Sequence, residues 1–130
     1  MWVPLEVAMQ LGYVVIYVND LERCHQFWTD QVGMVTKRTS ETDGFSIPQI
    51  GFADQDVAIE LVPNAFMEKA GHAAVTVAPS MCFHVNAIET EHQRLTAAGV
   101  VVSPIGDHFG TTTFAFSDPE DRWFAVISKP

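Results

Sequence analysis

The sequence contains five histidines, the side chain that most readily binds a transition metal or carries a proton near neutral pH. His25 and His92 fall at matching positions of two expected helices, where such pairs are more often packing or surface residues than ligands. His72 and His108 fall in expected loops, and His84 falls in an expected strand. The chemistry that this chain can perform therefore depends on which elements bring polar side chains together.

Length and composition predict one compact domain, residues 1–130, that binds neither nucleic acid nor membrane. The chain has 130 residues, 48% of them hydrophobic, which is enough for one core and too many for a disordered chain. Its net charge of −9 disfavours nucleic acid and anionic membranes, and it permits a cationic ligand. No apolar run approaches the ~20 residues that span a bilayer, and the first ten residues lack a signal-peptide layout. Cys24 and Cys82 do not indicate a disulfide framework, so a cytoplasmic location is expected.

The chain contains an internal repeat. Residues 13–30 and 80–97 align without a gap, and residues 52–56 match residues 116–121 ahead of the last strand of each half. Because these matches occur in register, the two halves are expected to fold as the same structural unit. Six of the eighteen aligned positions are identical: Val18/Val85, Asn19/Asn86, Glu22/Glu89, His25/His92, Gln26/Gln93 and Thr29/Thr96.

Each half predicts a strand followed by a helix. Residues rich in Val, Ile, Tyr and Phe predict the first strand, at 11–18 and at 80–86. Asp20 and Asn86 then offer N-cap oxygens for helices at about 20–32 and 88–98, and Gly33 and Gly99 stand where a helix C-cap favours glycine. The first helix has one apolar stripe, formed by Leu21, Cys24, Trp28 and Val32.

Three strand-like stretches follow each helix, which gives the order β-α-β-β-β twice. Module one covers about residues 11–63 and module two about 80–129, joined by a linker, 64–79, with a short helix near 66–70. The strands are expected at 34–42, 45–53 and 57–63, with a turn at Asp43-Gly44, and at 100–105, 111–117 and 122–128, with a turn over 117–121.

In this order, the motifs resemble the vicinal oxygen chelate superfamily, the fold of glyoxalase I, extradiol dioxygenases and bleomycin resistance proteins. Residues 13–33 resemble its opening strand, capped helix and glycine turn, and residues 58–62 resemble the closing strand of its first module. Phe109-Gly110, followed by residues 116–119, resembles the last hairpin of its second module. The resemblance covers about residues 11–129. It implies an α+β fold in which two βαβββ modules form an open, barrel-like mixed sheet with helices on its outer face.

In the metal-dependent enzymes of that superfamily, four side chains in the concave cup hold one divalent cation. The resemblance places these positions at Tyr13, Glu60, Ser80 and Ala125. Only Glu60 is a suitable ligand, because tyrosine and serine bind divalent ions poorly at neutral pH and alanine cannot bind them. His84 does not complete the set, since four residues of strand place it about 13 Å from Ser80. We therefore expect no metal and no cofactor.

Strand alternation predicts which other side chains share the cup with these positions. The expected ligand-binding residues are Tyr13, Tyr17, Glu60, Ser80, His84 and Trp123. Aromatic walls with a few polar groups suit a drug-sized, partly aromatic ligand, and Glu60 suits a cationic one. The competing interpretation is that Tyr17 and Trp123 fill the cup as ordinary core.

Three functions fit these features. The leading hypothesis is a metal-independent binding protein that sequesters an aromatic or cationic small molecule, such as an antibiotic. The alternative is a glyoxalase-like lyase or isomerase, or a dioxygenase, with an atypical metal site that includes Glu60 or with acid–base catalysis by Glu60 and His84. The third is an interaction scaffold without a ligand. The resemblance also implies a homodimer. The apolar N-terminal arm, residues 1–10, either reaches a neighbouring subunit or is a frayed terminus or a remnant of cloning.

Overall fold

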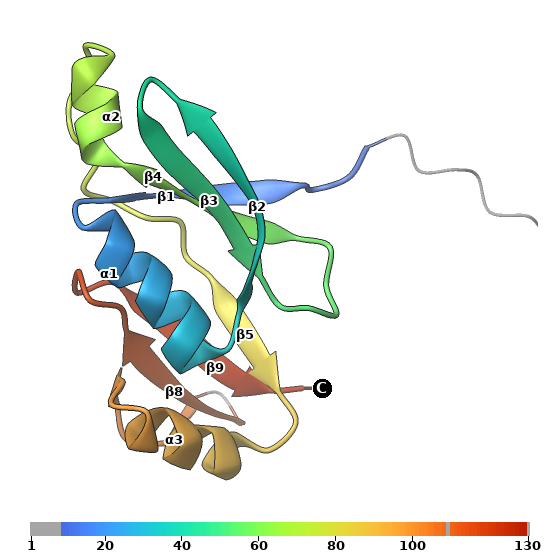
Figure 1. Cartoon of the computed structure of the whole chain (residues 1–130). Coiled ribbons are helices and arrows are strands. Elements are labelled where there is room, and N and C mark those ends of the chain that lie inside the picture. The colour runs from blue at the N-terminus through green and yellow to red at the C-terminus, as the bar shows by residue number, and fades with distance from the viewer. Residues whose placement is uncertain (1–8, 109, 130) are drawn as a thin grey trace, which may run out of the picture.

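The internal repeat is visible as two successive groups of elements in the computed structural model, which describes residues 9–108 and 110–129 (Figure 1). The N-terminal arm lies outside the described residues except for Met9 and Gln10. The first module comprises β1 (Tyr13–Val18), α1 (Leu21–Gln26), η1 (Phe27–Val32), β2 (Val35–Thr42), β3 (Phe45–Gly51) and β4 (Ala58–Pro63). After α2 (Asn64–Lys69), the second comprises β5 (Cys82–Val85), α3 (Ile88–Ala97), β6 (Val101–Val102), β7 (Gly106–His108), β8 (Thr111–Ser117) and β9 (Trp123–Ser128).

The strands form two mixed sheets, one from each module. The order is β1-β4-β3-β2 in the first sheet and β5-β9-β8-β6 in the second, where β7 also pairs with β8. In each module the opening strand lies parallel to the closing strand, and the other pairs are antiparallel. The expected α+β class with two repeated modules is confirmed, and β1 and β5 are edge strands of two separate sheets.

The helix expected at 20–32 is confirmed in extent, but its hydrogen-bonding pattern changes midway. The Asp20 carboxylate accepts a hydrogen bond from the Arg23 N–H at 3.1 Å, as expected for an N-cap. The α-helix α1 then widens into the π-helix η1, which ends at Gly33 with a left-handed φ of 106°. In the second module the expected cap is wrong: α3 follows Ala87, and no side chain, including that of Asn86, caps it.

Two expected turns and one expected strand show how local chemistry shapes the sheets. Asp43 and Gly44 both have positive φ, and Thr42 pairs with Phe45, so they form the expected two-residue hairpin. Asp121, also with positive φ, lies in the expected turn before β9. The strand expected at 100–105 is instead two short strands, β6 and β7, because Pro104 between them has no N–H to donate to a neighbouring strand.

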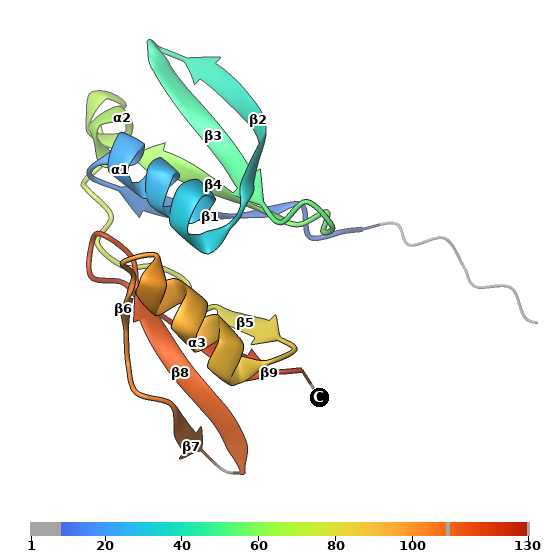
Figure 2. The ribbon, with the colours of Figure 1, turned by 60° about the horizontal axis from the view of Figure 1, so that its bottom comes forward.

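The helix formed by α1 and η1 lies between the two sheets and gives them a common core (Figure 2). On one side α1 packs on β4. On the other, the Trp28 ring lies 5.4–6.0 Å from the rings of Phe83, Phe116 and Phe124 of the second sheet. Alternate residues of both sheets point into this core, including Ile16, Val18 and Leu61 from the first and Phe116, Phe124 and Val126 from the second.

None of the described helices is long and apolar enough to cross a membrane.

The position of Trp28 leads to a stability prediction. Trp28 is fully buried, and its indole N–H has no hydrogen-bond partner among the described residues. Trp28→Ala should lower the free energy of unfolding by about 3–5 kcal/mol, because it removes the packing that joins the sheets. Trp28→Phe should cost about 1–2 kcal/mol, since it keeps most of the ring and sacrifices no hydrogen bond. Urea unfolding measures both, with the exposed Trp123→Ala as the control; equal losses at positions 28 and 123 would contradict the shared core.

Candidate functional site

Each sheet has an outer face, defined here as the face that points away from α1 and η1. The outer face of the first sheet carries three of the six candidate residues. Tyr13 and Tyr17 of β1 point to the same side as Glu60 of β4, because Val15 between them pairs with Glu60 in parallel register. Tyr13 is 46% exposed, and Tyr17 and Glu60 are half-buried. The Glu60 carboxylate accepts a hydrogen bond from the Gln49 side-chain amide of β3 at 2.8 Å. This face therefore offers an aromatic ring and a carboxylate that is held in place by its neighbour.

The outer face of the second sheet carries Trp123 and His84. Trp123, the first residue of β9, is 53% exposed, and His84 of β5 is exposed as well. Between them the face is lined by Ala115 and Ala125, which pair across β8 and β9. Because alanine side chains are short, they leave space above this part of the sheet, beside the indole ring of Trp123. Ser80 is exposed but lies before β5 begins, so strand alternation does not fix its direction.

Within one chain, these two outer faces do not form one cup. Both sheets turn their inner faces toward the same helix, so their outer faces lie on separate surfaces of the molecule. No hydrogen bond joins Tyr13, Tyr17 or Glu60 to the side chains of Ser80, His84 or Trp123 in the described part of the chain. Glu60 and His84 lie on different sheets, and the described residues show no hydrogen bond between them, so their joint acid–base role stays a prediction.

The four positions that hold a divalent ion in the metal-dependent enzymes of the resembling superfamily carry residues that do not fit such an ion. Glu60 is the only suitable donor of the four, and its carboxylate already accepts from Gln49. Ala125 has no donor atom, and it lies on the other sheet. Within residues 9–108 and 110–129, no three histidine, cysteine, aspartate or glutamate side chains are grouped so that they could hold a metal ion.

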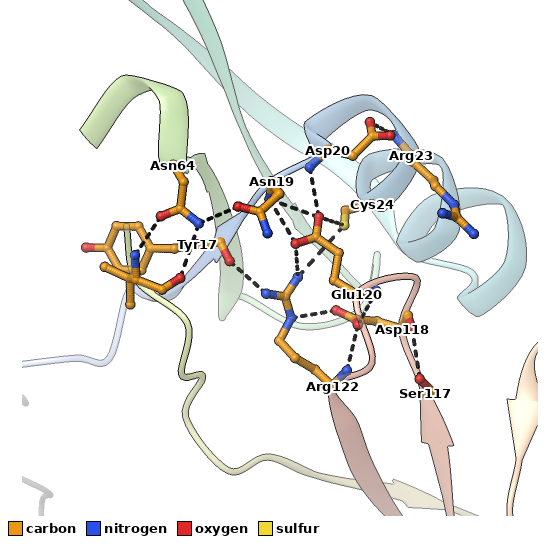
Figure 3. Close-up of polar contacts among 11 residues, drawn as sticks. Tyr17, Asn19, Asp20, Arg23, Cys24, Asn64, Ser117, Asp118, Glu120 and Arg122 are labelled. Atoms are coloured by element: carbon orange, nitrogen blue, oxygen red, sulfur yellow. Dashed lines mark hydrogen bonds and ion pairs between the residues drawn. The ribbon is translucent and has the colours of Figure 1, made fainter. Parts of the chain in front are cut away.

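A polar cluster joins the two modules at the turn between β8 and β9 (Figure 3). The Glu120 carboxylate accepts hydrogen bonds from the backbone N–H groups of Asn19 and Asp20 at 2.8–2.9 Å. It also accepts from the Cys24 thiol at 3.2 Å. A carboxylate of the second module therefore satisfies donors at the start of the first module's helix, where negative charge is favoured.

Arg122 extends this cluster to both sheets. Its guanidinium donates to the Asp118 carboxylate at 2.7 Å and to the Tyr17 carbonyl at 2.8 Å. Asp118 is buried and also accepts from the backbone N–H groups of Glu120 and Arg122, which fixes the turn. Because Trp123 directly follows Arg122, this contact ties the backbone of Tyr17 to the start of the strand that carries Trp123.

The buried cysteine in this cluster is unsuited to nucleophilic chemistry. Burial raises the pKa of the Cys24 thiol well above its usual range, and the hydrogen bond to Glu120 and the negative charges of Glu120 and Asp118 raise it further. Burial alone would raise the pKa of Glu120 too, but the hydrogen bonds from Asp20, Asn19 and Cys24, together with Arg122, lower it below its ordinary value. The cluster thus contains an ionised carboxylate beside a neutral thiol. Its hydrogen bonds connect the second module to the first, which is a structural role.

Sequence reasoning identified residues 117–121 only as a turn, and it missed this cluster. Glu120 meets Asn19 across 101 residues, so no local pattern indicates the contact. One signal was available in the repeat: Glu120 and Arg122 correspond to Gln55 and Val57 of the first module. Two charges present in only one copy of a repeat indicate a contact that only that copy makes.

Comparisons with known proteins agree with the fold. The family model described as Glyoxalase/Bleomycin resistance protein/Dioxygenase superfamily matches residues 10–126. No curated protein matches the sequence. Among solved structures, TnmS3, an antibiotic binding protein from Streptomyces sp. CB03234, is 16% identical, with a TM-score of 0.76 over 96% of this chain and 100% of that one.

Two further solved structures show the same likeness. A member of the glyoxalase/bleomycin resistance protein/dioxygenase superfamily from Sphaerobacter thermophilus DSM 20745 is 18% identical, with a TM-score of 0.76 over 93% of this chain and 98% of that one. A glyoxalase/bleomycin resistance protein/dioxygenase from Nocardioides is 19% identical, with a TM-score of 0.72 over 95% and 85% of the two chains. At these identities the likeness establishes the fold and leaves the ligand open.

The lowered pKa of Glu120 predicts how stability depends on pH. A carboxyl group whose pKa is lower in the folded chain than in the unfolded chain stabilises the fold above its unfolded pKa and loses that effect as the pH falls. Glu120→Gln should therefore lower the free energy of unfolding at pH 7 by about 1–3 kcal/mol, because the replacement keeps only part of the hydrogen bonding and no charge. The deficit should shrink between about pH 5 and pH 3 as wild-type Glu120 becomes protonated.

Denaturant unfolding at each pH measures this effect. Glu22→Gln, in the exposed first turn of the same helix, is the matched control and should change stability by less than about 0.5 kcal/mol. A deficit in Glu120→Gln that stayed constant from pH 7 to pH 3 would rule out the proposed ionisation effect.

Proposed function

Because the chain belongs to the glyoxalase/bleomycin resistance protein/dioxygenase superfamily, we propose that it binds and sequesters a small, partly aromatic molecule without a metal ion. The ligand lies on the outer faces of the two sheets, against Tyr13, Tyr17 and Glu60 of the first and against Ser80, His84 and Trp123 of the second. The compound is an antibiotic or another toxic small molecule. This last point is supported by TnmS3, a protein of the same fold that is described as antibiotic binding.

The observation that carries this proposal is the exposure of two large aromatic side chains on these faces. Among the residues that the structure describes, Tyr13 at 46% and Trp123 at 53% are the two aromatic side chains that are exposed. Exposed aromatic rings on a rigid sheet bind flat molecules by stacking, because little conformational freedom is lost when the ligand binds. Ala115 and Ala125 leave space for such a ring beside Trp123.

The chemistry of the donor atoms supports a role without metal. A divalent ion at this place would need several nitrogen or oxygen donors, and Glu60 is the only suitable one among the four positions. Its carboxylate instead suits a cationic group on the ligand, and the neighbouring tyrosine rings add attraction of about 0.5–2 kcal/mol per cation–π contact.

A homodimer would complete this site. Because Glu60 and Trp123 belong to different sheets, we infer that a single chain does not place both against one small molecule. Two copies related by a twofold axis can place the first sheet of one chain opposite the second sheet of the other, and this arrangement forms two equal sites. The free edges of β1 and β5 allow the sheets of two chains to meet side by side.

Thermal unfolding in the presence of a panel of aromatic, cationic and neutral antibiotics tests the proposed function. At least one compound should stabilise the chain by about 2.7 kcal/mol when present at a hundred times its Kd. Trp123→Ala should weaken the binding of that compound about tenfold or more, because it removes the stacking surface. Val101→Ala, which alters another exposed apolar residue of the second sheet, should leave the affinity unchanged. Absence of stabilisation by every compound would argue strongly against sequestration.

Metal removal and sedimentation test the other two parts of the proposal. Dialysis against a chelator should leave the affinity for the same compound unchanged, since no step of binding uses a divalent ion. Equilibrium sedimentation should give the mass of two chains at the concentrations where the compound binds. One equivalent of metal per chain with binding lost on chelation would refute metal independence, and a monomer that binds with full affinity would refute the shared site.

A further inference from the structure

A cavity of about 590 Å³ opens between the two modules, lined by core residues of both sheets and by the whole of the edge strand β5. Its walls come from η1, both sheets and α3, and they include Val14, Val32, Ile59, Phe83, Leu95 and Val126. Of the six residues of the proposed ligand site, only His84 contributes to it. The size falls within the range of cavities that hold drug-sized ligands. Its apolar walls are in contact with water unless a molecule fills them, which favours an apolar occupant.

The repeat relates the side of the molecule where the cavity opens to a side where the two modules are fastened together. On the opposite side, Glu120 and Arg122 fasten the turn of the second module to the helix of the first. The matching loop of the first module has Gln55 and Val57 at those positions, and it lines the mouth of the cavity instead. Gln55 is bonded within its own module: its N–H donates to the Phe52 carbonyl, and its carbonyl accepts from the Lys37 side chain. One contact of a quasi-symmetric pair is therefore closed and the other is open.

We propose that this open side is a second binding site, for a small molecule with an apolar body and one carboxylate group. The apolar body occupies the cavity, where side chains of the hydrophobic core are its neighbours. The carboxylate lies at the mouth beside Lys129, whose side chain makes no ion pair with the other residues that the structure describes. This site is distinct from the sheet faces, and it does not depend on the function proposed for them.

The position of the carboxylate follows from the surroundings of Lys129. A smaller hollow of about 340 Å³ adjoins the cavity, shares Lys129, His84, Val85 and Glu91 with it, and reaches Asn86 and Ala87 at the start of α3. In the repeat these last two correspond to Asn19 and Asp20, whose N–H groups bind the Glu120 carboxylate. A ligand carboxylate at the hollow would thus take the place that Glu120 has in the other half.

The acidic groups at the mouth leave room for this ligand charge. Glu91 is paired with Arg94 at 2.6 Å, so its charge is already balanced. Asp54 lines the larger cavity and is exposed to solvent, where water and salt screen it. Of the lysine and arginine side chains that line the two hollows, Arg94 is paired with Glu91, and Lys129 has no ion pair with another described residue.

Octanoate, octanol and octylammonium test the site, because they share one apolar chain and differ in the charge of its end. Calorimetry with the full chain should give the tightest binding for octanoate, with octylammonium at least tenfold weaker. Lys129→Gln should weaken octanoate severalfold and bring its affinity close to that of octanol, whereas Lys69→Gln, on α2, should change neither. Val14→Phe should abolish the binding of all three compounds by filling the cavity.

Two controls separate this site from the one proposed above. Trp123→Ala and Glu60→Gln should leave octanoate binding unchanged, and loss of binding in either would assign octanoate to the sheet faces and overturn the inference. Equal binding of octanoate and octylammonium would overturn the role of Lys129. A second copy of the chain is the other occupant to test, and sedimentation with each compound tests it. If octanoate does not bind and Val14→Phe dissociates a dimer, the cavity is an interface between two copies. That outcome would overturn the inference.

Discussion

The burial of one helix between two sheets is the constraint on which the rest of this structure depends. Trp28 contacts three phenylalanines of the second sheet, while α1 packs on β4 of the first. The buried residues of each sheet are thereby directed toward this helix, and Tyr13, Tyr17, Glu60, His84 and Trp123 lie on the opposite faces. Each candidate residue on a strand is consequently assigned to one sheet or the other, and the proposed ligand site draws on both.

The sequence predicted what is local or repeated. Periodicity located the helix that contains Cys24 and Trp28, and alternation correctly separated the buried Ile16 and Val18 from Tyr13 and Tyr17. Those signals depend on residues that are close along the chain, so they can be recognised from the sequence alone. The cap proposed at Asn86 is wrong because the N-cap position falls on Ala87, the residue that corresponds to Asp20 in the repeat and that has no side-chain oxygen.

The relation between the sheets could not be predicted in the same way. Alternation tells which face of a strand a side chain occupies, but it does not tell which way that face points relative to another sheet. The contacts that decide this are long-range, such as Glu120 with Asn19 and Arg122 with the Tyr17 carbonyl. Alternation therefore assigned the candidate residues to the faces of their own strands. How the two sheets come together depends on contacts between residues about 100 positions apart, which no local pattern can indicate.

The attachment of Glu120 to the first module uses main-chain atoms of Asn19 and Asp20 rather than their side chains. Such a junction tolerates evolutionary drift at residue 19, because almost any amino acid supplies the same N–H group. The exception is proline, which has no N–H. The Asn19 side chain accepts a separate hydrogen bond from the Asn64 amide, so a substitution at residue 19 would remove that contact and leave the bond to Glu120 in place.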